Sequence, residues 1–211
     1  EGLVGSEMCI RDRHKIFLKK SKNKLPNIHA IFKANGPIYL SASQEDLFTH
    51  MARLLCSQQL SLSAADTIWR KIISQLELDN YLLFDACNDS YIDKIKSCGL
   101  SSNKVKALMG LKNAFTSEQI SNKLLSNKSH PEVVKLISSL WGFGPWSGDM
   151  IAMFYLGLED VWSNGDLILN RGIRTLSENT TYLDSELLEF FSPYKSYLAL
   201  HIWKATNSKL L

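Results

Sequence analysis

Apolar residues recur through most of this chain at the spacing of an α-helix, and almost nowhere at the alternating spacing of a strand. Met51 and Leu55 fall on one helical face, and Ile68 and Ile72 fall on another. The stretch 33–43 is the one segment that could be extended, and it is too short and isolated to build a sheet. We therefore expect an all-α protein.

The helical period begins at about residue 43 and predicts roughly ten short helices. From residue 80 onward, helices are expected at about 80–97, 102–115, 117–125, 131–140, 145–157, 166–177, 185–191 and 195–206. With 211 residues and 45% hydrophobic content, the chain can bury a substantial core.

Composition excludes several classes of protein. The longest apolar run, 150–158, is about half of the roughly 20 residues that a membrane span needs. We expect no span and a cytoplasmic protein, associated with the nucleoid if the source is prokaryotic. The four cysteines form no C-x-x-C pair, so no metal site is predicted from side chains. A net charge of +3 permits a polyanionic partner without requiring one.

Residues 1–25 are expected to be an artefactual or flexible N-terminal segment. The first thirteen have neither a helical period nor the apolar core of a signal peptide. Five lysines then crowd the interval 15–24 with no acid among them, which suits a solvated basic arm or a phosphate-binding one.

A glycine-rich hairpin, LWGFGPWSGDM at residues 140–150, separates two short amphipathic segments. Gly142 stands where a helix end needs a left-handed residue, and Gly144 lets the backbone approach another molecule closely. Pro145 and Trp146 open the next helix. A helix that starts this way directs backbone N–H groups at an anion, of which a nucleic-acid phosphate is the obvious example. On the glycines alone, an ordinary connection between two packed helices is the preferred explanation of the pattern.

Four blocks of the sequence resemble the helix-hairpin-helix superfamily of DNA glycosylases and, within it, the 3-methyladenine DNA glycosylase II branch. They are LLCSQQLSLSAA at 54–65, CGLSSNKVKAL at 98–108, LWGFGPWSGDMIAMFYLGLEDVWSNGDLILNRGI at 140–173 and SPYKSYLALHIWKA at 192–205. The third is the specific one, because Asp166 follows the hairpin at the family's spacing. The resemblance implies two helical subdomains with the active cleft between them. We expect one from residues 26–60 and 165–211, and the other from 61–164, ending in the helix-hairpin-helix at 131–157.

In the superfamily, the residue at the Asp166 position is the catalytic carboxylate. Cleaving an N-glycosidic bond builds positive charge on the sugar, and a fixed carboxylate stabilises that charge. The start of a helix should also keep the carboxylate ionised. From the residues alone Asp166 could be only a helix N-cap, and both roles can coexist. Asp149, in a helix turn, and Asp160, in a connecting loop, are weaker candidates.

Trp146 stands where relatives that also cleave the DNA strand carry a lysine, whose amine forms a Schiff base with the sugar. The resemblance therefore implies a monofunctional enzyme that uses water. No cysteine follows Cys98, so the iron-sulfur cluster of some relatives is not expected.

The resemblance places Trp146, Met150 and Trp203 on the walls of the base pocket, with Met150 where some relatives carry tyrosine. Alkylated purines such as 3-methyladenine and 7-methylguanine are cationic, so aromatic rings can bind them and the charged base leaves readily. Packing in the core is the alternative for Trp203.

Contacts with DNA are expected from Gly142, Phe143 and Gly144 of the hairpin, from the turn residues Gln59, Leu60 and Ser61, and from Lys104. Leu60 is the better wedge for the gap that a flipped base leaves, because it is apolar. The alternatives are a buried contact between helices for Leu60 and a solvated surface position for Lys104.

We expect a monofunctional DNA glycosylase that flips out and hydrolytically excises alkylated purines from duplex DNA in base excision repair, as a monomer. The open alternatives are a related glycosylase for another damaged or mismatched base and a non-catalytic helix-hairpin-helix module that binds damaged DNA. No cofactor is expected, although Na⁺, K⁺ or Mg²⁺ could bridge the backbone of Leu140 and Gly142 to a phosphate, as in relatives.

Overall fold

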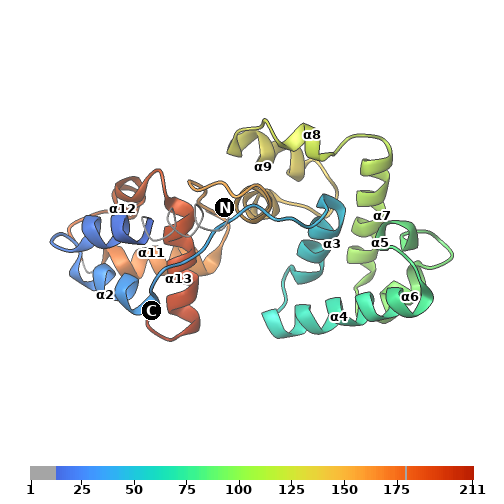
Figure 1. Cartoon of the computed structure of the whole chain (residues 1–211), viewed down its shortest axis with the longest axis horizontal. Coiled ribbons are helices and arrows are strands. Elements are labelled where there is room, and N and C mark those ends of the chain that lie inside the picture. Colours follow the sequence, from blue (N-terminus) through green and yellow to red (C-terminus); the bar gives the residue numbers. More distant parts are fainter. Residues whose placement is uncertain (1–12, 179) are drawn as a thin grey trace, which may run out of the picture. The chain divides into compact units, whose positions relative to one another are not determined.

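The computed structural model describes residues 13–178 and 180–211, which are helical and contain no strand, as the apolar period predicts. The chain divides into two compact units (Figure 1). The terminal unit comprises the residues up to Ala42 together with Gly157–Leu211, and the central unit comprises Ser43–Leu156. None of the described helices combines the length and the apolar character that crossing a bilayer requires.

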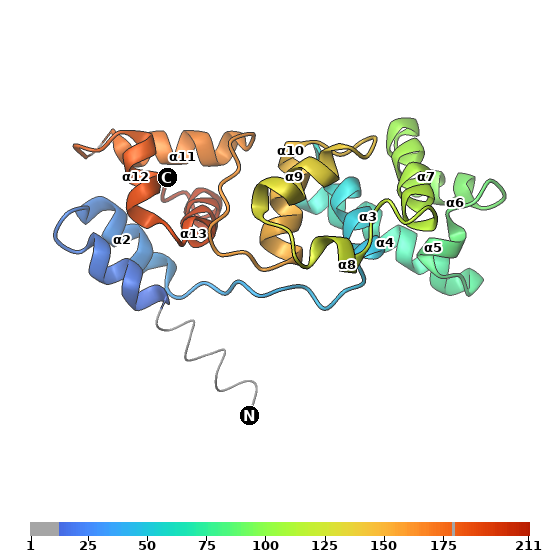
Figure 2. The ribbon, with the colours of Figure 1, turned by 90° about the horizontal axis from the view of Figure 1, so that it is seen from above.

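The central unit is a bundle built around α3. Its elements are α3 (Leu47–Ser57), α4 (Leu62–Asp79), α5 (Leu83–Ala86), α6 (Ile92–Ser97), α7 (Ser102–Thr116), α8 (Asn122–Leu125), α9 (His130–Ser138), α10 (Pro145–Met150) and a π-helical turn, Ile151–Tyr155. Met51 and Leu55 are at most 2% exposed, as their spacing predicts. The Phe48 ring contacts those of Phe84 and Phe115, at centroid distances of 4.9 and 5.4 Å. Helix α3 thus packs on α4, α5 and α7 (Figure 2).

The division into units differs from the predicted one at α3 and at residues 157–164. The latter were predicted in the bundle but belong to the terminal unit, where Asp160 and Val161 hydrogen-bond to the start of α13 (Lys195–Asn207). The sequence prediction grouped residues 43–60 with the two ends of the chain, whereas in the structure they belong to the central unit. The reason is the buried face of α3, which meets α4 and α7 and is covered by them.

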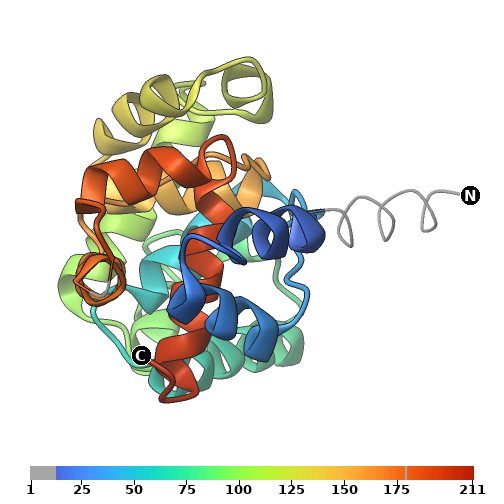
Figure 3. The ribbon, with the colours of Figure 1, turned by 90° about the vertical axis from the view of Figure 1, so that its left-hand side faces the viewer.

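The terminal unit joins the two ends of the chain. Its elements are a helix at 13–21, α2 (Pro26–Asn35), α11 (Leu167–Ser177), α12 (Asp184–Phe191) and α13 (Lys195–Asn207). Phe17, Phe32 and Phe191 are each at most 1% exposed and pack ring against ring at 5.0 to 5.4 Å between centroids. Figure 3 shows the two N-terminal helices in blue beside the C-terminal helices in red.

The expectation of a flexible or artefactual segment up to residue 25 is wrong for residues 13–25. Residues 1–12 lie outside the described part of the chain, but 13–21 form a helix. Phe17 and Leu25 are 1% and 0% exposed, so this segment contributes core. The helical period does not reveal this helix because its apolar residues are few and consecutive, at 16–18, among lysines.

Lys20 shows what one of these lysines does instead of forming a solvated arm. Its ammonium donates hydrogen bonds to the carbonyl oxygens of Phe190 and Ser192, at 2.8 and 3.3 Å. These carbonyls lie at the C-terminal end of α12, where a cation is favourable.

A buried histidine makes the terminal unit sensitive to acid. His201 is 2% exposed, and its Nδ1 lies 3.2 Å from the Nδ2 of Asn35. Burial, together with the charges of His14 and Lys204, lowers the pKa of His201 from 6.5 to about 3. Between these two values the unfolded chain binds a proton that the folded chain does not. Stability is therefore complete above the unfolded pKa and falls as the pH is lowered through it.

We expect the free energy of unfolding of the terminal unit to fall by about 2 kcal/mol between about pH 7 and about pH 5 through His201 alone. Urea unfolding at the two pH values measures this change. His201→Phe keeps a ring of similar size beside Phe17 and Phe32 and removes the titrating group, so it should flatten the dependence. An unchanged slope in that variant would place the effect elsewhere.

Candidate functional site

The segment that the glycine pattern predicts is a helix, a hairpin and a helix. Helix α9 begins at a capping box in which the Ser129 backbone N–H donates to Oε2 of Glu132 at 2.8 Å. A Cβ added at Gly148 would lie 2.6 Å from the Cα of Val134, so α9 and α10 touch backbone to backbone. A side chain at 148 would therefore force the two helices apart.

Asp149 is used in the same crossing. It is 7% exposed and accepts a hydrogen bond from Nε2 of His130 at 2.7 Å. Asp160 likewise accepts from Ser192 Oγ and from the backbone N–H of Lys195, both at 3.1 Å. Both carboxylates therefore hold elements together, which agrees with their weaker candidacy as catalysts.

The backbone conformation and the packing require a glycine at 142 but not at 144. Gly142 has φ +88°, as predicted, and a Cβ there would lie 2.4 Å from the Cβ of Ala107 on α7. Gly144 has an extended backbone, and a Cβ there would meet nothing within 4 Å. Nothing in the described fold therefore requires a glycine at 144. Phe143 is 5% exposed, so its side chain anchors the hairpin and only its backbone is placed to bind a ligand.

The turn between α3 and α4 is fastened to the hairpin by Gln58, which the sequence analysis did not single out. Its Nε2 donates to the carbonyl oxygen of Gly142 and to Oγ of Ser147, each at 3.1 Å. Lys104 fastens the other side, because its Nζ donates to the carbonyl oxygens of Cys56 and Gln58 at 2.7 and 2.8 Å. Burial lowers the pKa of Lys104. Lys104 is therefore not a solvated surface lysine, which was the alternative interpretation. Its partners here are two carbonyl oxygens, and its predicted contact with a DNA phosphate stays a prediction.

The predicted wedge residues form an exposed point on that turn. Gln59 has φ +58°, a left-handed conformation that a residue with a side chain rarely adopts. Leu60 is 40% exposed, which excludes the alternative of a buried contact between helices. Ser61 caps α4 by accepting from the backbone N–H of Ala64 at 3.3 Å. Leu62, which the sequence analysis passed over, is 79% exposed beside them.

Asp166 is the N-cap of α11 in the terminal unit. Its Oδ1 accepts hydrogen bonds from the backbone N–H groups of Ile168 and Leu169, at 3.0 and 2.9 Å. The indole N–H of Trp203 points at the same oxygen, at 3.4 Å. The carboxylate is thus held in one orientation by three donors from two helices.

Helix α11 is itself held close to α13, because a Cβ at Gly172 would lie 2.3 Å from Cγ2 of Ile202. Trp203 is half-buried and not part of the closed core. Leu167 and Ile168, next to Asp166, are 82% and 45% exposed. The helical spacing of apolar residues does not predict this exposed surface, because it identifies both residues as apolar without showing whether they are buried.

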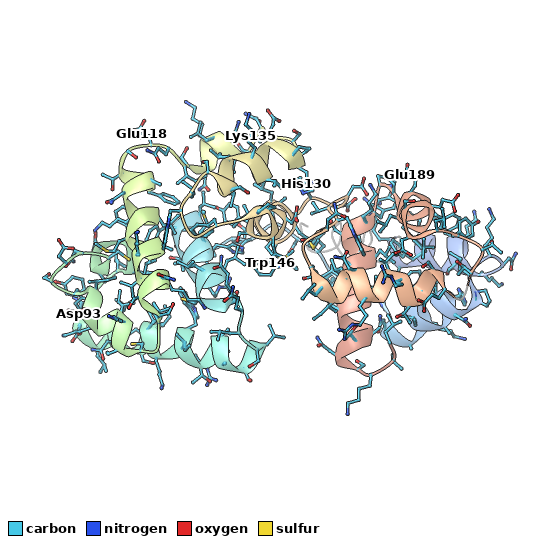
Figure 4. All side chains as sticks on the ribbon, turned by 180° about the vertical axis from the view of Figure 1, so that it is seen from behind. Asp93, Glu118, His130, Lys135, Trp146 and Glu189 are labelled. Carbon is cyan, nitrogen blue, oxygen red and sulfur yellow. The ribbon has the colours of Figure 1, made fainter. Side chains whose placement is uncertain are left out.

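The other two predicted pocket residues lie on α10 in the central unit. Trp146 is half-buried on the first turn of the helix (Figure 4). Met150 is 4% exposed, so in this structure it offers little surface to a ligand. Its place in a pocket stays a prediction.

Among the described residues, no group of three or more His, Cys, Asp or Glu side chains could hold a metal ion. The backbone oxygens proposed for a hairpin cation each already accept one hydrogen bond. The Leu140 oxygen accepts from the N–H of Phe143 at 3.1 Å, and the Gly142 oxygen accepts from Gln58. Each carbonyl has a second lone pair, so the expected ion is compatible with this geometry.

Solved structures define the class of fold, which is that of the helix-hairpin-helix 3-methyladenine DNA glycosylases. The 3-methyladenine DNA glycosylase of Schizosaccharomyces pombe in complex with abasic DNA matches with a TM-score of 0.76 and 22% identity, over 90% of this chain and 96% of that one. DNA-3-methyladenine glycosidase from Bacillus halodurans matches with a TM-score of 0.70 and 22% identity, over 91% and 88%.

Particular relatives also appear in sequence comparison. The chain is 28% identical to the DNA-3-methyladenine glycosylase of Saccharomyces cerevisiae, over 88% of this chain and 77% of the relative. It is 24% identical to DNA-3-methyladenine glycosylase 1 of Schizosaccharomyces pombe, over 79% and 75%. No protein-family model matches the sequence.

Proposed function

We propose that this protein is a monofunctional DNA glycosylase of the 3-methyladenine DNA glycosylase II type, which excises alkylated purines from duplex DNA in base excision repair. The observation that carries the proposal is the fixed carboxylate of Asp166, held by two backbone N–H groups and by the Trp203 indole, in a chain with the glycosylase fold. Two yeast relatives named DNA-3-methyladenine glycosylase support the substrate class.

The carboxylate of Asp166 has the chemistry that departure of a base requires. As the bond between the base and C1′ lengthens, positive charge grows on the sugar, and an oriented carboxylate stabilises it or orients the attacking water. The donors that hold Oδ1 fix the carboxylate before the reaction, so little reorganisation is needed. An alkylated purine is already cationic and leaves as a neutral base, so a strong general acid is not required.

The residue at 146 supports hydrolysis by water. An indole has no nucleophilic amine, so the Schiff base that precedes strand cleavage has no donor at this position. We propose that Trp146, Met150 and Trp203 line the base pocket, where the indoles attract the cationic ring by stacking and cation–π interaction, about 0.5–2 kcal/mol per contact.

We assign binding of the duplex to the hairpin and to the turn between α3 and α4 at residues 58–61, called the wedge turn below. The backbone at Gly142, which is exposed, and at Gly144, which has open space beside its Cα, suits a phosphate, because a side chain at 144 would obstruct the approach. A Na⁺, K⁺ or Mg²⁺ ion held by the carbonyls of Leu140 and Gly142 would add positive charge there.

Leu60 is the residue that fills the gap left by the flipped nucleotide, with Gln59 and Ser61 beside it. Lys104 can direct its remaining N–H at a phosphate, but its main role is to position this turn. The enzyme acts as a monomer.

A panel of duplexes, each with one lesion, tests the substrate class. Release of 3-methyladenine and 7-methylguanine, with oxidised and mismatched bases left in place, is the expected result. Release of an oxidised or mismatched base alone would favour the related-glycosylase alternative. Tight binding of the lesion with no abasic product would favour a damage-binding module.

Leu60→Ala should slow base release about five- to thirtyfold, because an apolar wedge contact is worth about 1–2 kcal/mol. Fluorescence of 2-aminopurine placed next to the lesion reports unstacking, and it should fall in parallel. Leu82→Ala is the matched control, since Leu82 is an exposed leucine at the start of α5, 73% accessible, outside the wedge turn. Equal rates for the two variants would remove the wedge role.

A further inference from the structure

The hairpin carries an exposed tryptophan that neither the fold nor the proposed reaction uses. Trp141 is 50% exposed, whereas its neighbours Leu140 and Phe143 are 8% and 5% exposed and anchor the hairpin. Packing does not explain this residue, because an indole stabilises a fold most when it is fully buried. An exposed indole on a short turn suggests a contact with another molecule.

A cation lies over this indole. The Nζ of Lys106, on α7, is 4.6 Å from the centroid of the Trp141 ring. Lys106 is exposed, and α7 carries three lysines and no acid. Among the described residues, the indole is the one partner of its ammonium, while Lys104 on the same helix is engaged by two carbonyls. The ring is not a hydrogen-bond acceptor of the ordinary kind, so the N–H donors of this exposed ammonium can still bind an anion.

A hollow of about 310 Å³ within the central unit has Trp141 in its lining, together with Lys104 of α7. Its polar lining comes mainly from amide side chains and its apolar lining from Leu55 and Ala107, and no carboxylate takes part. The residues that matter here are Gln58, Gln59, Asn103, Trp141 and Gly142. Gly142 and Gln59 also belong to the hairpin and the wedge turn, so the hollow is continuous with the surface assigned to DNA.

We propose that Trp141 and Lys106 form a further contact for the DNA backbone, with the indole against a deoxyribose and the ammonium on the adjoining phosphate. The inference rests on the proposed function, because it takes duplex DNA as the ligand. The backbone of DNA alternates a small apolar sugar with an anion, and the pair presents an exposed apolar ring together with a cation, with 4.6 Å between the ammonium and the ring centroid. The amide-lined hollow beside Trp141 admits the backbone without a repelling carboxylate.

The test measures dissociation constants of the full chain for a fluorescein-labelled duplex that contains a tetrahydrofuran abasic site, at several salt concentrations. Trp141→Ala should weaken binding about tenfold, and Trp141→Phe should retain most of the affinity. Lys106→Gln should also lower the slope of log K against log salt by about 0.9, because one phosphate contact is lost.

Lys112→Gln is the matched control. Lys112 lies on the same helix and over another ring, that of Phe84, with 5.1 Å between Nζ and the centroid. Its removal should leave both the affinity and the salt slope unchanged. Melting temperatures of all variants separate a loss of contact from a loss of fold.

Two outcomes overturn the inference, and they are distinguishable. If the wild-type protein releases alkylated bases but Trp141→Ala and Lys106→Gln bind within twofold of it, the function stands and this contact does not. If the wild-type protein binds no duplex at all, the proposed function fails together with the contact. A tenfold loss for Trp141→Ala with the control unchanged supports the contact even when no base is released.

Discussion

Asp166→Asn should lower the single-turnover rate of base release by roughly 10²- to 10⁴-fold, because it removes the charge that stabilises the sugar. The folded protein should be little affected. Asparagine is as good an N-cap as aspartate, and its Oδ1 can accept from the same backbone N–H groups of Ile168 and Leu169. Binding of duplex with an abasic site should stay within a few-fold of wild type.

Asp46→Asn is the matched control for this variant. Asp46 caps α3 as Asp166 caps α11, accepting from the N–H of Thr49 at 2.9 Å. Its replacement keeps a cap and should leave base release unchanged. Undiminished release by Asp166→Asn would mean that Asp166 is a cap only, and the catalytic assignment would fail.

Gly142→Ala should strongly destabilise the central unit. Alanine at φ +88° costs about 1–2 kcal/mol, and its methyl group would overlap Ala107, which costs about 1–3 kcal/mol more. The added Cβ at 142 would lie only 2.4 Å from the Cβ of Ala107. We expect the free energy of unfolding, measured in urea, to fall by roughly 2–5 kcal/mol.

Two companion variants separate the causes. Ala107→Gly in the Gly142→Ala background removes the overlap but not the backbone strain, so it should restore only part of the loss. Gly144→Ala meets nothing within 4 Å and has an extended backbone, so stability should be unchanged or slightly higher. If the proposed function is right, however, Gly144→Ala should weaken DNA binding. Equal stability losses at 142 and 144 would contradict the geometry of the hairpin.

Local patterns in the sequence predict much of this structure. The left-handed conformation of Gly142 follows from a glycine after an apolar helix, and the cap at Asp166 follows from an acid before another. Both depend on a few neighbouring residues, so the sequence contains the information. The exposed point at Leu60 could be predicted only as one of two possibilities, because the same leucine suits a turn or a core.

Other features depend on partners distant in the chain. The positioning roles of Gln58 and Lys104 appear only in the fold, which brings the hairpin and α7 beside the α3–α4 turn. The helix at 13–21 has few apolar positions, and its burial depends on rings from α2 and α12, which sequence order does not reveal. Trp141 reads as part of an apolar helix end, and only the structure shows half of its surface exposed.

Free base released from methylated duplex DNA by the wild-type protein, separated by chromatography, tests the central claim most directly. Strand integrity is followed in the same samples before and after alkali. We predict that 3-methyladenine and 7-methylguanine accumulate while the strand stays whole until alkali cleaves it at the abasic site. Absence of free base despite binding of the duplex, or strand cleavage before alkali, would contradict hydrolysis directed by Asp166.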